Sequence, residues 1–209
     1  MAYPLDSEGN RMRLLAQINF SEVPHLEDYP ESGILQFFIM AEDDVFGMDF
    51  DNLISQKDFR VVFHEYIHEE LMETNFEKFN ITQHDWFPVL HESKMKFEVL
   101  EEAVSPEDYK FVKYFGAEAY NLFTDDEFEE YYNKFSSTGH KIGGYAFFTQ
   151  YDPRMQDEYK DYEYLLLQLD SDDSIDMLWG DCGVANFFIT KDDLKRRDFS
   201  KVLYTWDCC

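Results

Sequence analysis

Apolar residues alternate with other residues near both ends of the chain, at the two-residue period of β-strands. Every second position is apolar in residues 14–20, from Leu14 to Phe20, and again in residues 165–169. Residues 34–39 and 184–189 are apolar on nearly both faces, which is typical of central strands. The pattern therefore predicts strands with apolar faces in both terminal regions.

The strands at the two ends are also similar in sequence, which indicates an internal duplication. Gln17 matches Gln168 at an offset of 151 residues, and Gly33 matches Gly183 at an offset of 150. A carboxamide recurs a second time, because Asn186 stands where Gln36 stands in the first copy. The matched segments follow in the same order in both copies: 14–20 with 165–171, 29–39 with 179–189, 43–45 with 192–194, and 58–67 with 198–207, which sets His64 against Tyr204.

The middle of the chain predicts two helices and two further strands. Ser105, followed by Pro106 and Asp108, marks one helix start, and Thr124 with Glu127 forms a capping box for the second. The further strands are expected at residues 94–100 and 145–150.

These elements predict a β-rich α+β fold, with duplicated, mainly antiparallel, roll-like sheets and two helices inserted between the repeats. We expect a single domain over residues 1–209, made of repeat 1 (about 1–100), a helical insert (about 104–136) and repeat 2 (about 140–209).

The charge of the chain restricts its partners. There are 18 Lys and Arg residues against 44 Asp and Glu, a formal net charge of -26. Such a surface repels nucleic acid and anionic membranes, whereas a basic protein partner is compatible with it; the acids can also serve only solubility. The chain has no apolar run of the roughly 20 residues that span a bilayer, and the three cysteines form no disulfide framework, so we expect a cytoplasmic protein.

The segment "RVVFHEYIHEE" (60–70) contains the pattern His64-Glu65-x-x-His68. On a helix this pattern holds zinc in metallopeptidases. On a strand the two imidazoles would lie about 13 Å apart, too far to share one metal ion. The alternation and β-branched content of residues 59–66 favour the strand, so we predict no metal site and no catalytic residues.

A small set of side chains has the chemistry of a ligand pocket. Aromatic faces beside carboxamides suit sugars or nucleosides, and the candidate contacts are Trp179, Tyr145, Gln168 and Asn186. The same amides can instead satisfy backbone groups of the fold. No cofactor fingerprint is present, and we predict none.

Three stretches carry a family resemblance: "HKIGGYAFFTQYDPR", "LLLQLDSD" and the run from Trp179 to Cys209. With them the chain resembles the YwqG-like family, bacterial proteins known as a domain of unknown function, and residues 3–24 and 29–39 also fit. The resemblance implies a β-rich, roll-like duplicated fold and no established activity, cofactor or catalytic residue. Members of the family usually have a further amino-terminal region with a strand equivalent to the one at Gly143 and Gly144, and this region is expected to be absent here.

The two repeats also differ in length before their first matched strand: 25 residues, from position 140 to position 164, precede Leu165 in repeat 2, but only 13 precede Leu14. We therefore expect an open sheet edge in repeat 1 and self-association through it. The function expected from the sequence is a non-enzymatic binding protein, whose partner is a basic protein that it neutralises. The alternatives are a small-ligand binder or hydrolase with a cleft between the repeats and, third, a zinc metallopeptidase.

Overall fold

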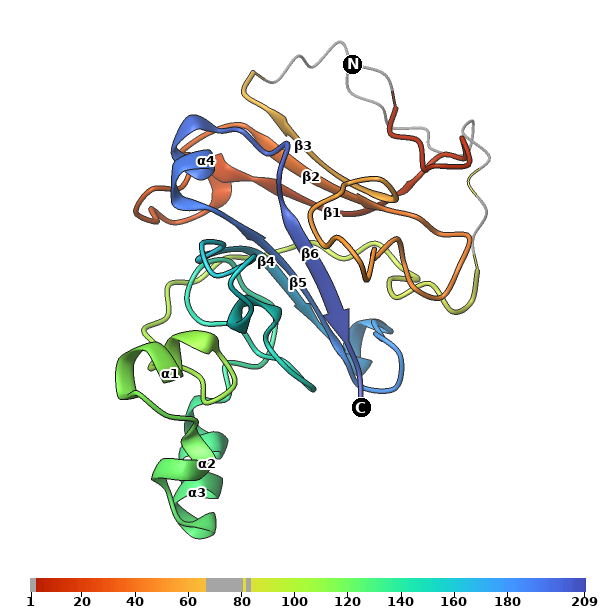
Figure 1. Ribbon diagram of the computed structural model, residues 1–209. Helices are drawn as coiled ribbons and strands as arrows, with labels where there is room; N and C mark the ends of the chain where they lie inside the picture. Colours follow the sequence, from red (N-terminus) through yellow and green to blue (C-terminus); the bar gives the residue numbers. More distant parts are fainter. Residues whose placement is uncertain (1–2, 67–80, 82–83) are drawn as a thin grey trace. The chain divides into compact units, whose positions relative to one another are not determined.

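Two three-stranded sheets form the framework of the protein (Figure 1). The computed structural model describes residues 3–66, 81 and 84–209. In the first sheet the strand order is β1-β2-β3 and both pairings are antiparallel; in the second the order is β4-β5-β6, with β4 antiparallel to β5. The predicted β-rich α+β class is confirmed. The strands are β1 (Arg13–Asn19), β2 (Ile34–Ile39), β3 (Phe59–His64), β4 (Tyr164–Asp170), β5 (Val184–Ile189) and β6 (Leu203–Asp207).

Helices lie mainly between the two sheets in the sequence. They are α1 (Tyr109–Phe115), α2 (Ala119–Leu122), α3 (Asp125–Phe135) and α4 (Lys191–Arg196), with short 3₁₀ turns at Phe20–Glu22, Pro153–Met155 and Asp173–Ile175. The capping box predicted for α3 is confirmed: Thr124 accepts from the Glu127 N–H, and the Glu127 carboxylate accepts from the Thr124 N–H. The predicted start of α1 at Ser105 is wrong, because Asp108 caps the helix by accepting from the Lys110 N–H.

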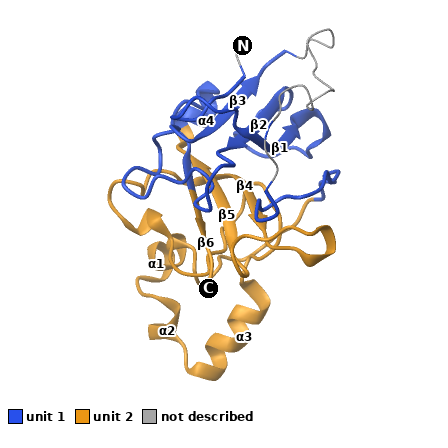
Figure 2. Cartoon of the chain, turned by 90° about the vertical axis from the view of Figure 1, so that its right-hand side faces the viewer, with its two compact units in different colours: residues 1–98, 192–204 blue, residues 99–191, 205–209 orange. Residues whose placement is uncertain are grey.

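The chain divides into two compact units (Figure 2). Unit 1 contains residues 1–98 and 192–204, and unit 2 contains residues 99–191 and 205–209. In unit 1, the core includes the fully buried Ile18, Leu35 and Phe59; in unit 2, it includes the fully buried Phe187 and Phe188. No helix in the described ranges is long and apolar enough to cross a membrane.

The two sheets repeat the same strand register. Gln17 lies opposite Gln36 in the first sheet, and Gln168 lies opposite Asn186 in the second. The register slips at equivalent places, between Leu14 and Ala16 in β1 and between Leu165 and Leu167 in β4. Because bulges are specific local features rather than a general property of strands, the shared bulge supports the duplication seen in the sequence. The offset changes from 151 to 150 because the connection to β5 is one residue shorter than the connection to β2.

The glycine that precedes the second strand of each sheet shows which residues of β3 and β6 are equivalent. A Cβ atom added to Gly33 would lie 2.8 Å from the His64 carbonyl oxygen, and one added to Gly183 would collide with the carbonyl oxygen of Asp207. Asp207 therefore occupies the place of His64. The expected match of His64 with Tyr204 is three residues out of register, because aromatic residues occur at several positions of both segments.

Two strands expected from alternation are not formed. Residues 94–100 have no regular secondary structure, and Val99 and Leu100 are 68% and 85% exposed. Residues 145–148 also lie outside any strand, although Lys141 makes an isolated bridge to Gln168. Alternation gives a segment one apolar face, but a strand also needs a neighbouring chain for its backbone hydrogen bonds.

Candidate interaction site

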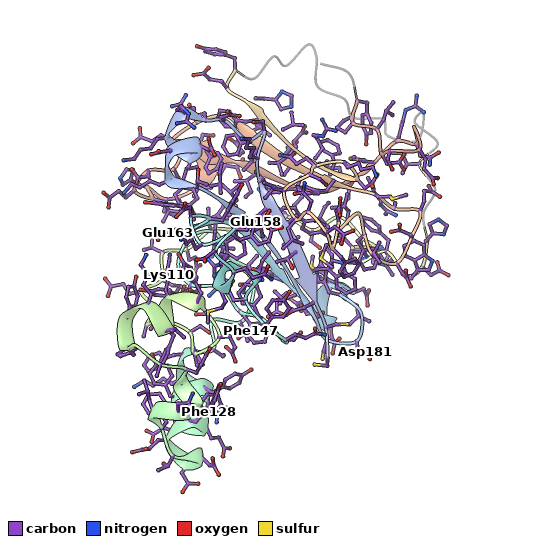
Figure 3. The ribbon with its side chains drawn as sticks, in the orientation of Figure 1. Lys110, Phe128, Phe147, Glu158, Glu163 and Asp181 are labelled. Atoms are coloured by element: carbon purple, nitrogen blue, oxygen red, sulfur yellow. The ribbon has the colours of Figure 1, made fainter. Side chains whose placement is uncertain are left out.

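A pair of buried carboxamides in unit 2 holds an extended segment of the same chain. Gln168 and Asn186 are both fully buried, on neighbouring strands. The Gln168 Oε1 accepts from the N–H of Phe147 at 2.8 Å, and the Asn186 Nδ2 donates to the Phe147 carbonyl at 2.9 Å. The Gln168 Nε2 donates to the carbonyls of Ser137 and Gly139 at 2.9 and 2.8 Å. The two amides thus fasten the backbone of residues 137–147, with Phe147 labelled in Figure 3.

The same segment pairs with the outer edge of β4 through its main chain. The Gln168 N–H donates to the Lys141 carbonyl at 2.8 Å, and the Lys141 N–H donates back at 3.2 Å. The Gly143 N–H donates to the Leu165 carbonyl at 2.8 Å. Gly143 and Gly144 both have φ of +71°, which favours glycine where the segment turns after its edge contacts. The segment therefore combines edge pairing with side-chain amide contacts.

The equivalent amides of unit 1 are arranged differently. The Gln36 Nε2 donates to the Gln17 Oε1 at 2.7 Å, and the His64 Nε2 lies 3.1 Å from the Gln36 Oε1. Burial lowers the pKa of His64, which favours the neutral imidazole. An amide oxygen only accepts, so the His64 Nε2 must carry the hydrogen of this contact. Gln17 is exposed, whereas its counterpart Gln168 is fully buried.

A buried ion cluster stabilises the packing of unit 2. The Arg154 guanidinium lies 2.9 Å from Asp108 and 2.7 Å from Asp152, and all three side chains are at most 1% exposed. The carboxylates also accept from main-chain N–H groups, Asp108 from Ala146 and Asp152 from Tyr109, both within 3 Å. Burial disfavours the charged guanidinium, but the two carboxylates hold the Arg154 pKa above its usual value. Each charge is satisfied from within the fold, so the cluster has a structural role.

Two further carboxyl groups of unit 2 have altered acidity. Burial raises the pKa of Glu107 to about 7, an effect that Asp207 strengthens and a hydrogen bond from the Ser105 hydroxyl opposes. Burial also raises the pKa of Asp207, although Asp207 accepts from the N–H groups of Gln150 and Thr149. Raised carboxyl pKa values occur at catalytic sites and at structural ones. Since Asp207 is bound to the backbone of its own unit, the arrangement favours a structural role.

The cysteines are closer in space than their positions in the sequence indicate. The three thiols are free, and the Cys182 and Cys209 sulfur atoms lie 2.7 Å apart. This proximity could not be predicted from the sequence, because 26 other residues separate the two. Within the described ranges, no group of three or more His, Cys, Asp or Glu residues is suited to hold a metal ion.

The four candidate ligand contacts lie in unit 2. Gln168 and Asn186 are adjacent, and both bind Phe147. Tyr145 is partly buried, its N–H donates to Glu102 at 2.8 Å, and burial raises its pKa to about 12. Trp179 is fully buried; its main-chain N–H donates to the Ser171 hydroxyl, and its ring lies 6.2 Å from that of Trp206. The amides are thus brought together with the segment that contains Tyr145, whereas Trp179 contacts Ser171 and Trp206.

The residues of the zinc pattern are only partly described. His64 ends β3, and Glu65 follows it in a bend, so the predicted strand is confirmed at 59–64. His68 lies outside the described residues. The Glu65 carboxylate pairs with Arg197 at 2.7 Å.

The fold and its amide pairs define a class of protein: a β-rich α+β chain built from two similar sheet units. A family model described as a domain of unknown function, DUF1963, matches residues 1–208, and the chain belongs to this family. No curated protein matches the sequence.

Proposed function

We propose that this protein is a non-enzymatic interaction protein that binds a basic protein partner. The net charge of -26 carries the proposal. A charge of this size accelerates encounter with a positively charged protein and disfavours nucleic acid and anionic membranes as partners. Neutralisation of a basic partner is the role that such a surface serves best.

Helix α3 is the part of unit 2 where acidic side chains are densest. Five of its eleven residues are exposed carboxylates, and its one basic residue is Lys134. The helix carries Phe128 and Tyr131 among these acids, and both side chains are partly buried. Basic side chains of a partner can therefore meet carboxylates along a helix that its own capping box holds in place. The exposed acids are Asp125, Asp126, Glu127, Glu129 and Glu130.

The test is capture of partners by the tagged full-length chain, followed by binding kinetics with each purified partner. We expect partners of high isoelectric point whose association rate constant falls at least about tenfold between 0.05 and 0.5 M salt, because screening shortens the reach of the charges. The matched variant reverses Glu129 and Glu130 to Lys and should slow association. Partners that are acidic, or whose association rate does not change with salt, would contradict the proposal.

The proposal also includes membership of the YwqG-like family. The resemblance of residues 140–154 and 179–209 to the YwqG-like family supports a bacterial, cytoplasmic protein. The alternative is a binder or hydrolase of a small sugar-like or nucleoside-like ligand. A ligand that uses the Gln168 Oε1 and the Asn186 Nδ2 would have to displace the backbone of Phe147 from both amides, and this favours the protein partner.

A further inference from the structure

The edge of β1 in unit 1 is built like the occupied edge of β4 in unit 2. The Phe20 N–H donates to the Gly33 carbonyl, and the Ser171 N–H donates to the Gly183 carbonyl, so the ladders begin at equivalent pairs. Hydrogen-bonded and non-hydrogen-bonded pairs alternate along antiparallel strands. Three positions further on, the backbone N–H and C=O of Gln17 therefore point away from β2, as those of Gln168 point toward Lys141.

What differs between the units is the covering of this edge. Residues 137–147 cover Gln168, which is fully buried, whereas Gln17 is exposed. Within the part of the chain that the structure describes, only the side chain of Gln36 hydrogen-bonds to the Gln17 side chain. The Gln17 amide nitrogen is the counterpart of the Gln168 Nε2, which binds two carbonyls in unit 2.

The neighbouring part of the same face is covered in both units. Tyr3 packs against Phe38, with ring centroids 5.6 Å apart, and Phe148 packs against Phe188 at 6.1 Å. Phe38 and Phe188 hold equivalent positions in β2 and β5. The exposed part of this face in unit 1 is therefore limited to the surroundings of Gln17. In unit 2 the equivalent part is covered by the segment that ends at Phe147.

We propose that the outer edge of β1, together with the amides of Gln17 and Gln36, binds an extended peptide segment of a partner protein. Its main chain pairs antiparallel with β1 at Gln17, as Lys141 pairs with Gln168. The edge strand supplies main-chain hydrogen bonds and the amides supply side-chain ones, which is the chemistry of recognition by strand addition.

The unit 2 segment indicates which peptide fits. The residue that pairs with the edge is followed, two and three positions on, by the glycines 143 and 144, and an aromatic residue comes six positions on, at Phe147. Gly143 and Gly144 have positive φ, so a glycine pair is the expected signature of the peptide. These contacts are mainly with uncharged groups, and the inference stands apart from the proposed binding of a basic protein.

The experiment uses the full-length chain and a synthetic peptide with the sequence of residues 137–148, labelled for fluorescence anisotropy. We expect saturable binding, slower amide exchange at Gln17 in the complex, and little change in affinity between 0.05 and 0.5 M salt. N-methylation of the peptide nitrogen at the Lys141 position removes the donor and should weaken binding at least about tenfold. This change leaves the protein itself untouched, so loss of binding cannot come from misfolding.

Protein variants locate the site. Gln17→Ala combined with Gln36→Ala should weaken binding about fivefold to tenfold, whereas Asn133→Ala, which removes an exposed amide from α3, should leave it unchanged. Absence of saturable binding, or binding that tolerates the N-methyl group, would overturn the inference. Sedimentation showing a dimer that Gln17→Ala weakens, with no peptide bound, would assign the edge to a second copy of the chain instead. Because the peptide and the basic partner differ in salt dependence, either proposal can fail without the other.

Discussion

Arg154 is the residue on which the polar core of unit 2 depends. It compensates two carboxylates that are at most 1% exposed, and its guanidinium lies 3.9 Å from the centre of the Phe188 ring. Arg154→Met should lower the free energy of unfolding by about 3–5 kcal/mol, because it leaves Asp108 and Asp152 buried without a counter-charge. Urea denaturation measures this loss.

Two further variants test that explanation. Arg196→Ala removes an exposed arginine that pairs with Asp193, and it should change stability by no more than about 0.5 kcal/mol. Adding Asp108→Asn and Asp152→Asn to Arg154→Met should restore part of the lost stability. If the asparagines restore none of it, packing of the guanidinium rather than charge compensation explains the effect.

Glu107 should make the stability of the protein depend on pH. Its pKa is raised to about 7 in the folded protein, from an ordinary value of 4.5, so the folded state keeps a proton that the unfolded state releases. This contribution is fully present below about pH 4.5 and is lost as the pH rises through 7. Glu107→Gln should therefore gain stability relative to the parent chain between about pH 5 and 8, by roughly 1–2 kcal/mol after allowance for partial exposure. A constant difference across this range in urea titrations would contradict the prediction.

Cys182 and Cys209 should form a disulfide under oxidising conditions. Their sulfur atoms lie 2.7 Å apart, so little movement is needed to bring them to bonding distance. Oxidised glutathione is the oxidant: the two thiols lose two protons and two electrons, and one oxidised glutathione becomes two reduced molecules. Mass spectrometry of a digest should find the 182–209 crosslink. Cys182→Ser should abolish that crosslink, and Cys208→Ser should not; a crosslink dominated by Cys208 would refute the assignment.

At the scale of elements, the sequence predicted the strands and helix starts that depend on the local pattern of residues and on the internal repeat. Alternation located the strands at 14–20, 34–39 and 165–169, and Thr124 with Glu127 located the start of α3. The strands predicted at 94–100 and 145–150 are not formed, because a strand needs a hydrogen-bonding partner, which the sequence of one segment does not specify.

The buried amides of Gln168 and Asn186 show the same difference: their positions could be predicted from local sequence, but their long-range contacts could not. The sequence identified Gln168 and Asn186 as carboxamides that recur in the first repeat, at Gln17 and Gln36, and it allowed either hydrogen bonds to the backbone or a ligand contact. Which groups they bind was beyond prediction, because Phe147 and Gly139 are 21 and 29 residues from Gln168. Arg154, Asp108 and Asp152 were missed for this reason as well, since a buried ion cluster has no sequence signature in a chain so rich in acids.

The two amide pairs should differ in their effect on stability. Gln168→Ala leaves the N–H of Phe147 and the carbonyls of Ser137 and Gly139 without partners, and it should cost about 2–4 kcal/mol. Gln17→Ala, at the exposed counterpart, should cost about 0.5 kcal/mol or less. Hydrogen exchange should also become faster across residues 139–147 in the first variant only. Equal effects of the two substitutions would show that exposure does not separate the two sites.

At the scale of the whole molecule, the dominant property is a net charge of -26 spread over 209 residues. Like charges at this density repel one another more in the compact state than in the expanded chain, so they reduce stability while they keep the protein dispersed. The family is described as a domain of unknown function, so its membership assigns no activity to the chain. The net charge is therefore the property of the whole molecule from which we predict its behaviour in solution.

Moderate salt should stabilise the protein for this reason. The Debye length falls from about 30 Å at 0.01 M to about 8 Å at 0.15 M, which screens repulsion between distant carboxylates. We expect the thermal midpoint to rise by about 2–4 °C over this range, equivalent to roughly 1 kcal/mol for a chain of this size.

Reversing Glu129, Glu130, Asp157 and Glu158 to Lys changes the net charge by +8, from -26 to -18. Because repulsion grows with the square of the charge, the rise should be about half as large in this variant. All four side chains are exposed, and Glu158 is labelled in Figure 3, so the substitutions leave the core intact. Calorimetry at the two salt concentrations compares the chains, and an equal rise in both would mean that salt acts through something other than the surface charge.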